Sequence, residues 1–115
     1  MRKREPKLYL KDILDCIEKI NSYVKNISFE DFSKNTLIID AVIRNFEIVG
    51  EASKNIPEEM KTEYPEIPWK EMAGMRDKMI HEYFGVDLEI VRKIIKIRLP
   101  QILPLLEQIY NSLDE

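Results

Sequence analysis

The segment from residue 36 to residue 54 is apolar around most of its circumference, and this constrains the possible folds more than any other feature. Drawn as a helix, it leaves one narrow polar stripe, formed by Asp40, Arg44, Glu47 and Glu51. A helix of this kind is either central in a bundle or shared with another subunit. Small residues near its end would let a second helix approach closely: Gly50, Ala52 and Ser53.

The residues before this segment predict one amphipathic helix and a connection. Over residues 7–26, apolar side chains recur at three- and four-residue steps, and Pro6 suits the first turn. The link from Asn26 to Asn35 is expected to be held by polar turn or cap residues and by two aromatic anchors: Ser28 and Asp31, Phe29 and Phe32.

The residues after it predict a short turn and three more helices. Asn55 is expected to cap a turn over residues 57–63, and a third helix is expected over residues 68–84, with Pro68 in its first turn and Gly85 past its end. Asp87 would cap a fourth helix. Because Pro100 and Pro104 interrupt its pattern, we expect a kink or break near Leu99 and a last helix through Leu113.

These patterns predict an all-α single domain over residues 1–115, an antiparallel up-and-down bundle of four to five main helices. The chain has only three glycines and no Asn-Gly or Asp-Gly hairpin signal. Its one cysteine, Cys16, excludes an internal disulfide and a cysteine-rich zinc site, and is expected to be a buried apolar residue of the first helix. A single free cysteine suits a reducing cytoplasm.

The lack of long apolar runs argues against a membrane protein, and the net charge argues against a broad positive surface for binding nucleic acid. No apolar run reaches the length of a membrane span, and the basic start has no apolar run behind it, so no signal peptide is expected. The net charge is −3. Two local basic clusters remain, each read as a solvated face or as part of a local groove: Arg2, Lys3, Arg4 and Lys7, and Arg92, Lys93, Lys96 and Arg98.

The third predicted helix carries the only histidine of the chain, His81, five residues after Arg76 and two before Tyr83. An arginine that binds phosphate and a histidine that moves a proton are the minimum chemistry for cutting RNA without a metal. On a helical wheel, however, Arg76 lies at the centre of an apolar stripe and His81 lies about 140° away. Three interpretations of Arg76 follow. It is a functional residue that binds phosphate, it pairs with a core acid such as Glu47 or Glu51, or it bridges a subunit interface.

Two neighbours complete the candidate site. Asp77 stands four residues before His81, so its carboxylate can accept a hydrogen bond from the imidazole and orient it. Tyr83 shares the face of Arg76, where a tyrosine is normally a core residue with its hydroxyl at the rim. If His81 has no role together with Arg76, it is expected to be a partly exposed surface residue.

The segment Met75–Asp87, MRDKMIHEYFGVD, resembles the signature of HepT-type HEPN toxins, the ribonuclease half of bacterial and archaeal toxin–antitoxin pairs. The resemblance extends to Ile48–Pro57, to Ile67–Trp69 and to Asp87–Val91, and so to nearly the whole chain. It implies a HEPN-like homodimer in which two motifs line one cleft. It also implies catalytic roles for Arg76 and His81. Many members have asparagine after the arginine, where this chain has Asp77, and an acid there weakens anion binding.

The resemblance further implies a partner, a minimal nucleotidyltransferase antitoxin that would transfer AMP from ATP to Tyr83, with a larger hetero-oligomer as one assembly. The expected reaction is attack by the ribose 2′-hydroxyl on the phosphate held by Arg76, with His81 as general acid or base, and neither a metal nor another cofactor is expected. Two other hypotheses stay open: a non-catalytic binding subunit that assists the nucleotidyltransferase, favoured by Asp77 and the acidity, and a dimeric bundle whose motif is accidental.

Overall fold

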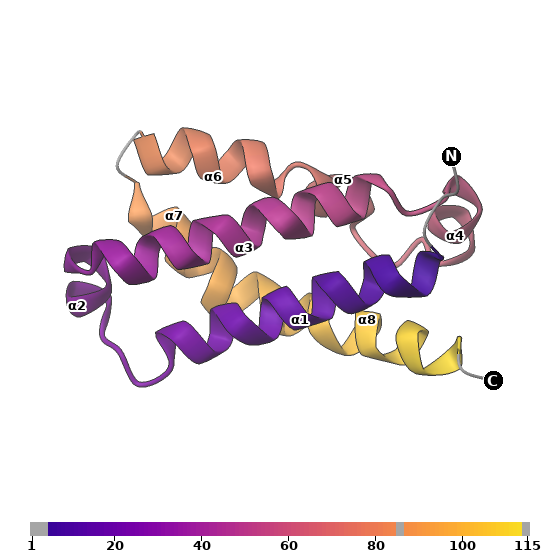
Figure 1. Cartoon of the computed structure of the whole chain (residues 1–115), viewed down its shortest axis with the longest axis horizontal. Coiled ribbons are helices and arrows are strands. Elements are labelled where there is room, and N and C mark those ends of the chain that lie inside the picture. Colours follow the sequence, from indigo (N-terminus) through magenta and orange to yellow (C-terminus); the bar gives the residue numbers. More distant parts are fainter. Residues whose placement is uncertain (1–4, 85–86, 114–115) are drawn as a thin grey trace.

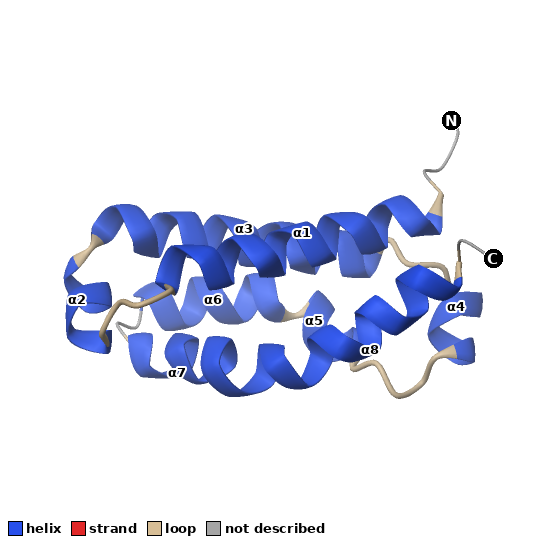
Figure 2. Cartoon of the chain, turned by 90° about the horizontal axis from the view of Figure 1, so that it is seen from below, coloured by secondary structure: helices blue, strands red, loops and turns tan. Residues whose placement is uncertain are grey.

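The structure is a computed structural model that describes residues 5–84 and 87–113, and the side chains of residues 5–79 and 87–113. Within these ranges the chain is an all-α bundle, as predicted. Four long helical segments run back and forth along the long axis of the bundle, and their connections lie at its two ends (Figures 1 and 2). In chain order these segments are α1, α3, α5 together with α6, and α7 through α8. Neighbouring segments are antiparallel.

Helix α1 (Pro6–Val24) places the predicted apolar positions in the core, with Leu10, Ile13 and Ile17 fully buried. The chain then turns at Asn26, whose φ of 60° lies in the left-handed region that asparagine tolerates. The predicted link contains a short helix, α2 (Phe29–Lys34). Ser28 caps it, because its Oγ accepts a hydrogen bond of 3.1 Å from the Asp31 N–H.

Helix α3 (Thr36–Lys54) is central in the bundle, which is one of the two positions that its composition predicts. It packs against α1, α2, α5 and α6 (Figure 1). The side chain of Asn35 caps its start, accepting a 3.0 Å hydrogen bond from the Ile38 N–H. The prediction that Asn55 caps the following turn was wrong. Asn55 closes α3 instead, where its Nδ2 donates to the Glu51 carbonyl, and Pro57 precedes α4 (Glu58–Glu63).

The single helix predicted over residues 68–84 is two helices, α5 (Trp69–Ala73) and α6 (Met75–Phe84). Gly74 separates them with φ −83° and ψ −4°. Glycine has a high cost in a helix interior and bends readily, so the axis changes direction there (Figure 1). The Trp69 indole N–H donates a 3.0 Å hydrogen bond to the Tyr64 carbonyl and fixes the start of α5.

At the kink or break predicted near Leu99, the chain stays helical but departs from regular α-helical geometry, so a full break was wrong. Helix α7 (Leu88–Lys93) passes into a π-helical turn, η1 (Ile94–Arg98), and then into α8 (Leu99–Ser112), so the backbone stays helical through both prolines. A proline lacks the N–H donor and its ring crowds the carbonyl four residues back, and the wider π turn accommodates this before Pro100. Arg98 ties this turn to α5 through two hydrogen bonds to Glu71, of 2.6 and 2.9 Å.

Candidate functional site

Helices α3 and α6 pack closely where Gly50 faces Arg76. A Cβ added to Gly50 would lie 3.0 Å from the Arg76 Cβ and 3.2 Å from the Ala73 carbonyl oxygen. These distances are shorter than nearly all real contacts, so no larger residue fits without movement. The small residue at position 50 therefore permits the close approach predicted from the sequence, and it fixes where the Arg76 side chain begins.

The Arg76 side chain starts in this tight contact but ends in solvent. Its guanidinium Nη1 lies 3.8 Å from the Glu51 Oε1, and the side chains are 42% and 57% exposed. This explains how an arginine stands at the centre of an apolar stripe: the stem packs on α3 and the charged head reaches the surface. One of the alternatives considered for Arg76, a pair with Glu51, is confirmed, although this acid lies at the rim of the bundle rather than in its core.

Arg76 and Glu51 line a groove of about 410 Å³ that runs between α1, α3 and α6. Its other lining residues are Tyr9, Asp12, Arg44, Glu47, Ile48, Ala52 and Asn55. Arg44 and Glu47 were not among the predicted site residues. Their signal was present in the sequence, since both belong to the narrow polar stripe of an otherwise apolar helix. Which helices would flank that stripe depends on tertiary packing and could not be read from it.

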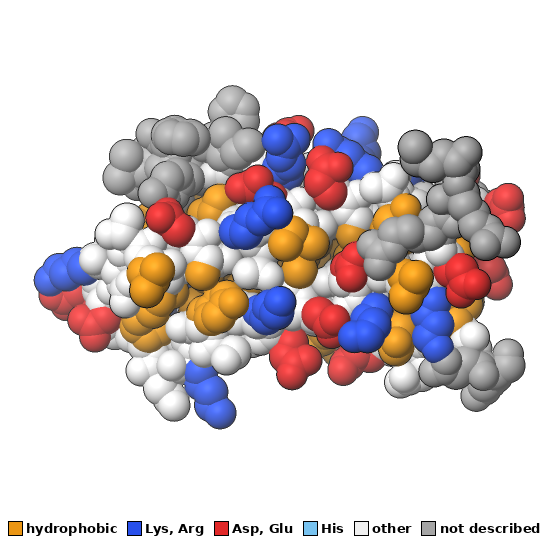
Figure 3. All heavy atoms as spheres, in the orientation of Figure 1, with side chains coloured by type: hydrophobic (Ala, Val, Ile, Leu, Met, Phe, Trp, Pro, Cys, Tyr) orange, Lys and Arg blue, Asp and Glu red, His pale blue; other side chains and the backbone are white. Residues whose placement is uncertain are grey.

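On the face seen in Figure 3, the described acidic and basic side chains are intermixed and form no continuous basic patch. Asp12, Glu47 and Glu51 give the groove three carboxylates against two guanidiniums. Any anion bound here is therefore held by local contacts with the arginines rather than by a broad positive surface, as the net charge predicted.

The structure only partly tests the rest of the predicted site. The backbone of α6 continues to Phe84, so Arg76, His81 and Tyr83 belong to one helix. The side chains of His81 and Tyr83 lie outside the described residues, and their proximity to Arg76 stays a prediction. Asp77 is exposed in the first turn of α6.

Cys16 is 5% exposed and packs in the core of the bundle, as predicted. Burial raises the pKa of its thiol, because the charged thiolate is poorly solvated there. A thiol in this position acts as a small apolar side chain, since the thiolate is the reactive form.

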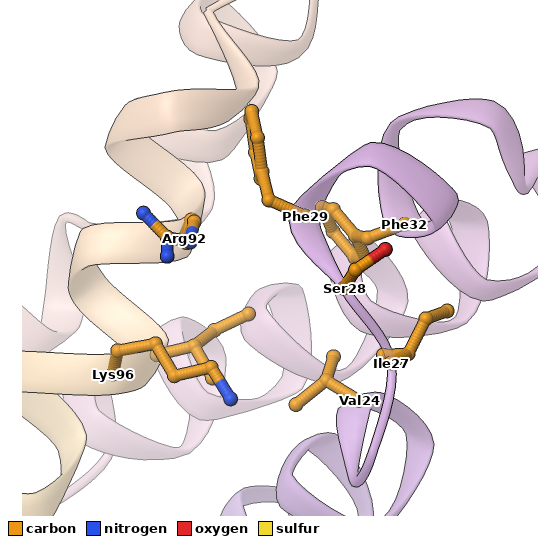
Figure 4. Close-up of a pocket in the computed structure, with 8 residues that line it drawn as sticks. Val24, Ile27, Ser28, Phe29, Phe32, Arg92 and Lys96 are labelled. Carbon is orange, nitrogen blue, oxygen red and sulfur yellow. The ribbon is translucent and has the colours of Figure 1, made fainter.

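A second cavity, of about 190 Å³, lies where the α1–α2 connection and α2 face α7 and the π turn. Figure 4 shows Arg92 and Lys96 on one wall, with Val24, Ile27 and the two phenylalanines facing them. The Arg92 guanidinium lies 5.3 Å from the centre of the Phe29 ring and also donates to Glu89. The late basic cluster is thus divided: Arg98 is bound to Glu71, Arg92 is held at this cavity, and Lys93 and Lys96 are exposed.

Two further properties concern the described residues alone. Residues 5–79 and 87–113 contain no group of three or more histidine, cysteine or acidic side chains arranged to hold a metal ion. None of the helices described is long and apolar enough to cross a membrane.

Comparison with known proteins assigns the chain to a family. The profile of the ribonuclease HepT-like family matches residues 13–109. A protein of Thermococcus cleftensis named "Probable ribonuclease HepT" is 52% identical over 100 residues, which cover 87% of this chain and 91% of that protein. A protein of Methanocaldococcus jannaschii named as a putative RNase is 45% identical over 115 residues, which cover 100% and 99% of the two chains.

No solved structure gives a significant match to the chain. The family profile and the two relatives each span most of the described helices, including α3 and the helix that carries Arg76. The resemblance seen in the motif therefore holds over the whole bundle, and the chain belongs to the ribonuclease HepT-like family.

Proposed function

We propose that the chain is a metal-independent endoribonuclease and the toxin of a toxin–antitoxin pair. The observation that carries this proposal is the position of Arg76. Its stem is fixed against Gly50, its head opens into a groove, and Glu51 lies 3.8 Å away, beyond hydrogen-bond range. The N–H donors of the Arg76 guanidinium therefore make no hydrogen bond to Glu51. A guanidinium with donors left over can bind a phosphate group through two parallel hydrogen bonds.

In the proposed reaction, Arg76 binds the scissile phosphate and stabilises the charge that develops on it. The ribose 2′-oxygen attacks phosphorus and loses its proton to a general base, while the bond from phosphorus to the 5′-oxygen breaks and that oxygen gains a proton. The products are a 2′,3′-cyclic phosphate and a 5′-hydroxyl. His81 acts as one of the two proton-transfer groups, and the His81 of a second copy supplies the other in a homodimer. Asp77 orients the imidazole.

The proposed control is modification of Tyr83. A minimal nucleotidyltransferase antitoxin would transfer AMP from ATP to the Tyr83 hydroxyl and release pyrophosphate. Tyr83 follows Arg76 by seven residues on α6, which is about two helical turns, so the added phosphate would lie on the same face as the guanidinium. It would compete with RNA by charge and by bulk. The proposed setting is the cytoplasm.

Expression in a bacterial host tests the proposal. The parent chain is expected to arrest growth and degrade RNA, whereas Arg76→Ala and His81→Ala are expected to do neither while remaining folded by circular dichroism. Tyr83→Phe is expected to stay toxic when a nucleotidyltransferase is co-expressed. Sedimentation of the purified chain gives its oligomeric state, for which we expect a dimer.

A specific observation also favours a second candidate, a non-catalytic subunit that positions a nucleotidyltransferase. Three carboxylates line the groove of Arg76, and exposed Asp77 follows it, so the surroundings disfavour a polyanion. Under this alternative, parent and His81→Ala behave alike in the growth assay and RNA stays intact.

A further inference from the structure

We infer that Arg44 is a second phosphate-binding residue of the groove, and that Glu47 and Glu51 are counter-ions that an RNA strand displaces from Arg44 and Arg76. The inference rests on the proposed function, because it takes the ligand to be RNA. It adds the path of the strand along α3 and the exchange of ion pairs on binding.

The placement of Arg44 supports this role. Arg44 and Arg76 line the same groove, Arg44 from α3 and Arg76 from α6. Arg76 meets α3 at Glu51, seven residues after Arg44, which corresponds to about 10 Å along the helix axis. Two arginines that reach α3 about two turns apart, on long side chains, suit two phosphates of one strand better than a single phosphate. The Arg44 side chain is 69% exposed and so is accessible from solvent.

Both arginines have weak resting partners. The Arg44 Nη1 lies 3.9 Å from the Glu47 Oε2, and the Arg76 Nη1 lies 3.8 Å from the Glu51 Oε1. Neither distance is a hydrogen bond, and exposed pairs of this kind contribute little to stability. A phosphate that accepts two hydrogen bonds from a guanidinium is a better partner than either glutamate, so exchange is favourable at each position.

The negative charges of Glu47 and Glu51 lead to a prediction that distinguishes this inference from a positioning role for the glutamates. Because Glu47 and Glu51 lie beside the two arginines in the groove, a bound strand is repelled by the glutamates that it displaces. Removing the charge of Glu47 or Glu51 is therefore expected to strengthen RNA binding. If these glutamates instead oriented the arginines for binding, the same change would weaken it.

Binding is measured on the purified full-length chain with a fluorescein-labelled, single-stranded 2′-O-methyl RNA oligonucleotide of twelve residues. This probe lacks the attacking hydroxyl, so the proposed cleavage cannot occur. Fluorescence anisotropy gives the Kd at several KCl concentrations. The variants are Arg44→Gln, Glu47→Gln and Glu51→Gln. The matched controls are Arg92→Gln and Glu89→Gln, because Arg92 and Glu89 form an exposed pair with the same three-residue spacing outside the groove.

We expect Arg44→Gln to raise the Kd about threefold to tenfold and to reduce the salt dependence of log K by somewhat less than one unit, as the loss of one phosphate contact on a single strand does. Glu47→Gln and Glu51→Gln are expected to lower the Kd by similar factors. The controls are expected to change it less than twofold. The inference is overturned if Arg44→Gln matches Arg92→Gln, or if Glu47→Gln and Glu51→Gln weaken binding.

Cleavage of an unmodified oligonucleotide separates this inference from the proposed function. If the parent cleaves RNA but Arg44→Gln binds the probe like the parent, the inference fails and the function stands. If the parent does not cleave but probe binding depends on Arg44 and is strengthened by Glu51→Gln, the function fails and the binding groove stands. Absence of any probe binding overturns the inference, and absence of both probe binding and cleavage overturns the inference and the function together.

Discussion

Two arginines of this bundle each face a glutamate on another helix, and they are held very differently. Arg98 in the π turn donates two hydrogen bonds to Glu71 of α5, of 2.6 and 2.9 Å, and a third to Gln101. Arg76 of α6 lies 3.8 Å from Glu51 of α3, and hydrogen bonds between them are absent at that distance. The two side chains are similarly exposed, at 36% and 42%, so burial does not explain the difference.

The comparison separates a structural arginine from one with binding capacity left. The two hydrogen bonds to Glu71 raise the pKa of the Arg98 guanidinium, and its planar fork is matched by one carboxylate. Arg76 has a fixed stem and a head that its neighbouring acid does not saturate. An arginine bridge between helices is therefore not a sign of function by itself, and the geometry of the pair distinguishes the two cases.

The largest expected difference is in RNA cleavage when each arginine becomes lysine. Arg76→Lys keeps the charge but loses the planar fork, and we expect cleavage to fall roughly 10-fold to 100-fold because the developing phosphate charge is less well held. Arg98→Lys is expected to leave the rate within about twofold. Initial rates on a labelled oligonucleotide measure both. Equal losses in the two variants would contradict the assignment of separate roles.

The close approach at Gly50 gives the next effect. Gly50→Val would push side-chain atoms into the Arg76 Cβ and the Ala73 carbonyl, and we expect the free energy of unfolding to fall by about 1–3 kcal/mol. Urea denaturation followed by circular dichroism measures it. Gly74→Ala is the matched control, because a Cβ there meets only carbonyl oxygens at 3.5 and 3.6 Å. A control that loses as much stability as Gly50→Val would show that the α3–α6 contact is not the cause.

The smallest expected effect compares the two glutamates. Glu71→Gln breaks a bidentate pair between α5 and the π turn, but the pair is largely exposed, so we expect a loss of at most about 1 kcal/mol. Glu51→Gln is expected to change stability by no more than about 0.3 kcal/mol, because its pair is longer and more exposed. Urea denaturation at low and high salt measures both, and a larger loss for Glu51→Gln would make the Arg76 pair structural.

Much of this fold is predictable because the spacing of apolar residues within one segment is enough to identify a helix and its buried face. The buried positions of α1 and the apolar circumference of α3 led directly to a bundle with α3 at its centre. The errors arise where one residue redirects a helix. Gly74 divides the third predicted helix, and a π turn keeps the backbone helical at the place where a kink or break was expected. These outcomes depend on how the flanking helices pack, which a pattern within one segment does not contain.

The site was predictable to a lesser degree. Arg76 was identified from its motif, and Glu51 was named as one of its two candidate acids. Glu47 was the other candidate acid, whereas Arg44 was identified only as a member of a polar stripe, because its place beside Arg76 requires α6 to lie against α3. That arrangement follows from the contact at Gly50, and the sequence indicated only that some helix could approach there.

Cleavage of RNA without metal ions is the most direct test of the role of Arg76. The purified parent, Arg76→Ala and Arg98→Ala are incubated with single-stranded RNA in EDTA, and the product ends are identified by mass spectrometry. We expect 2′,3′-cyclic phosphate ends from the parent and from Arg98→Ala. Arg76→Ala is expected to lose product at least 100-fold, while all three proteins remain equally helical. Undiminished cleavage by Arg76→Ala, or an equal loss in Arg98→Ala, would contradict this role of Arg76.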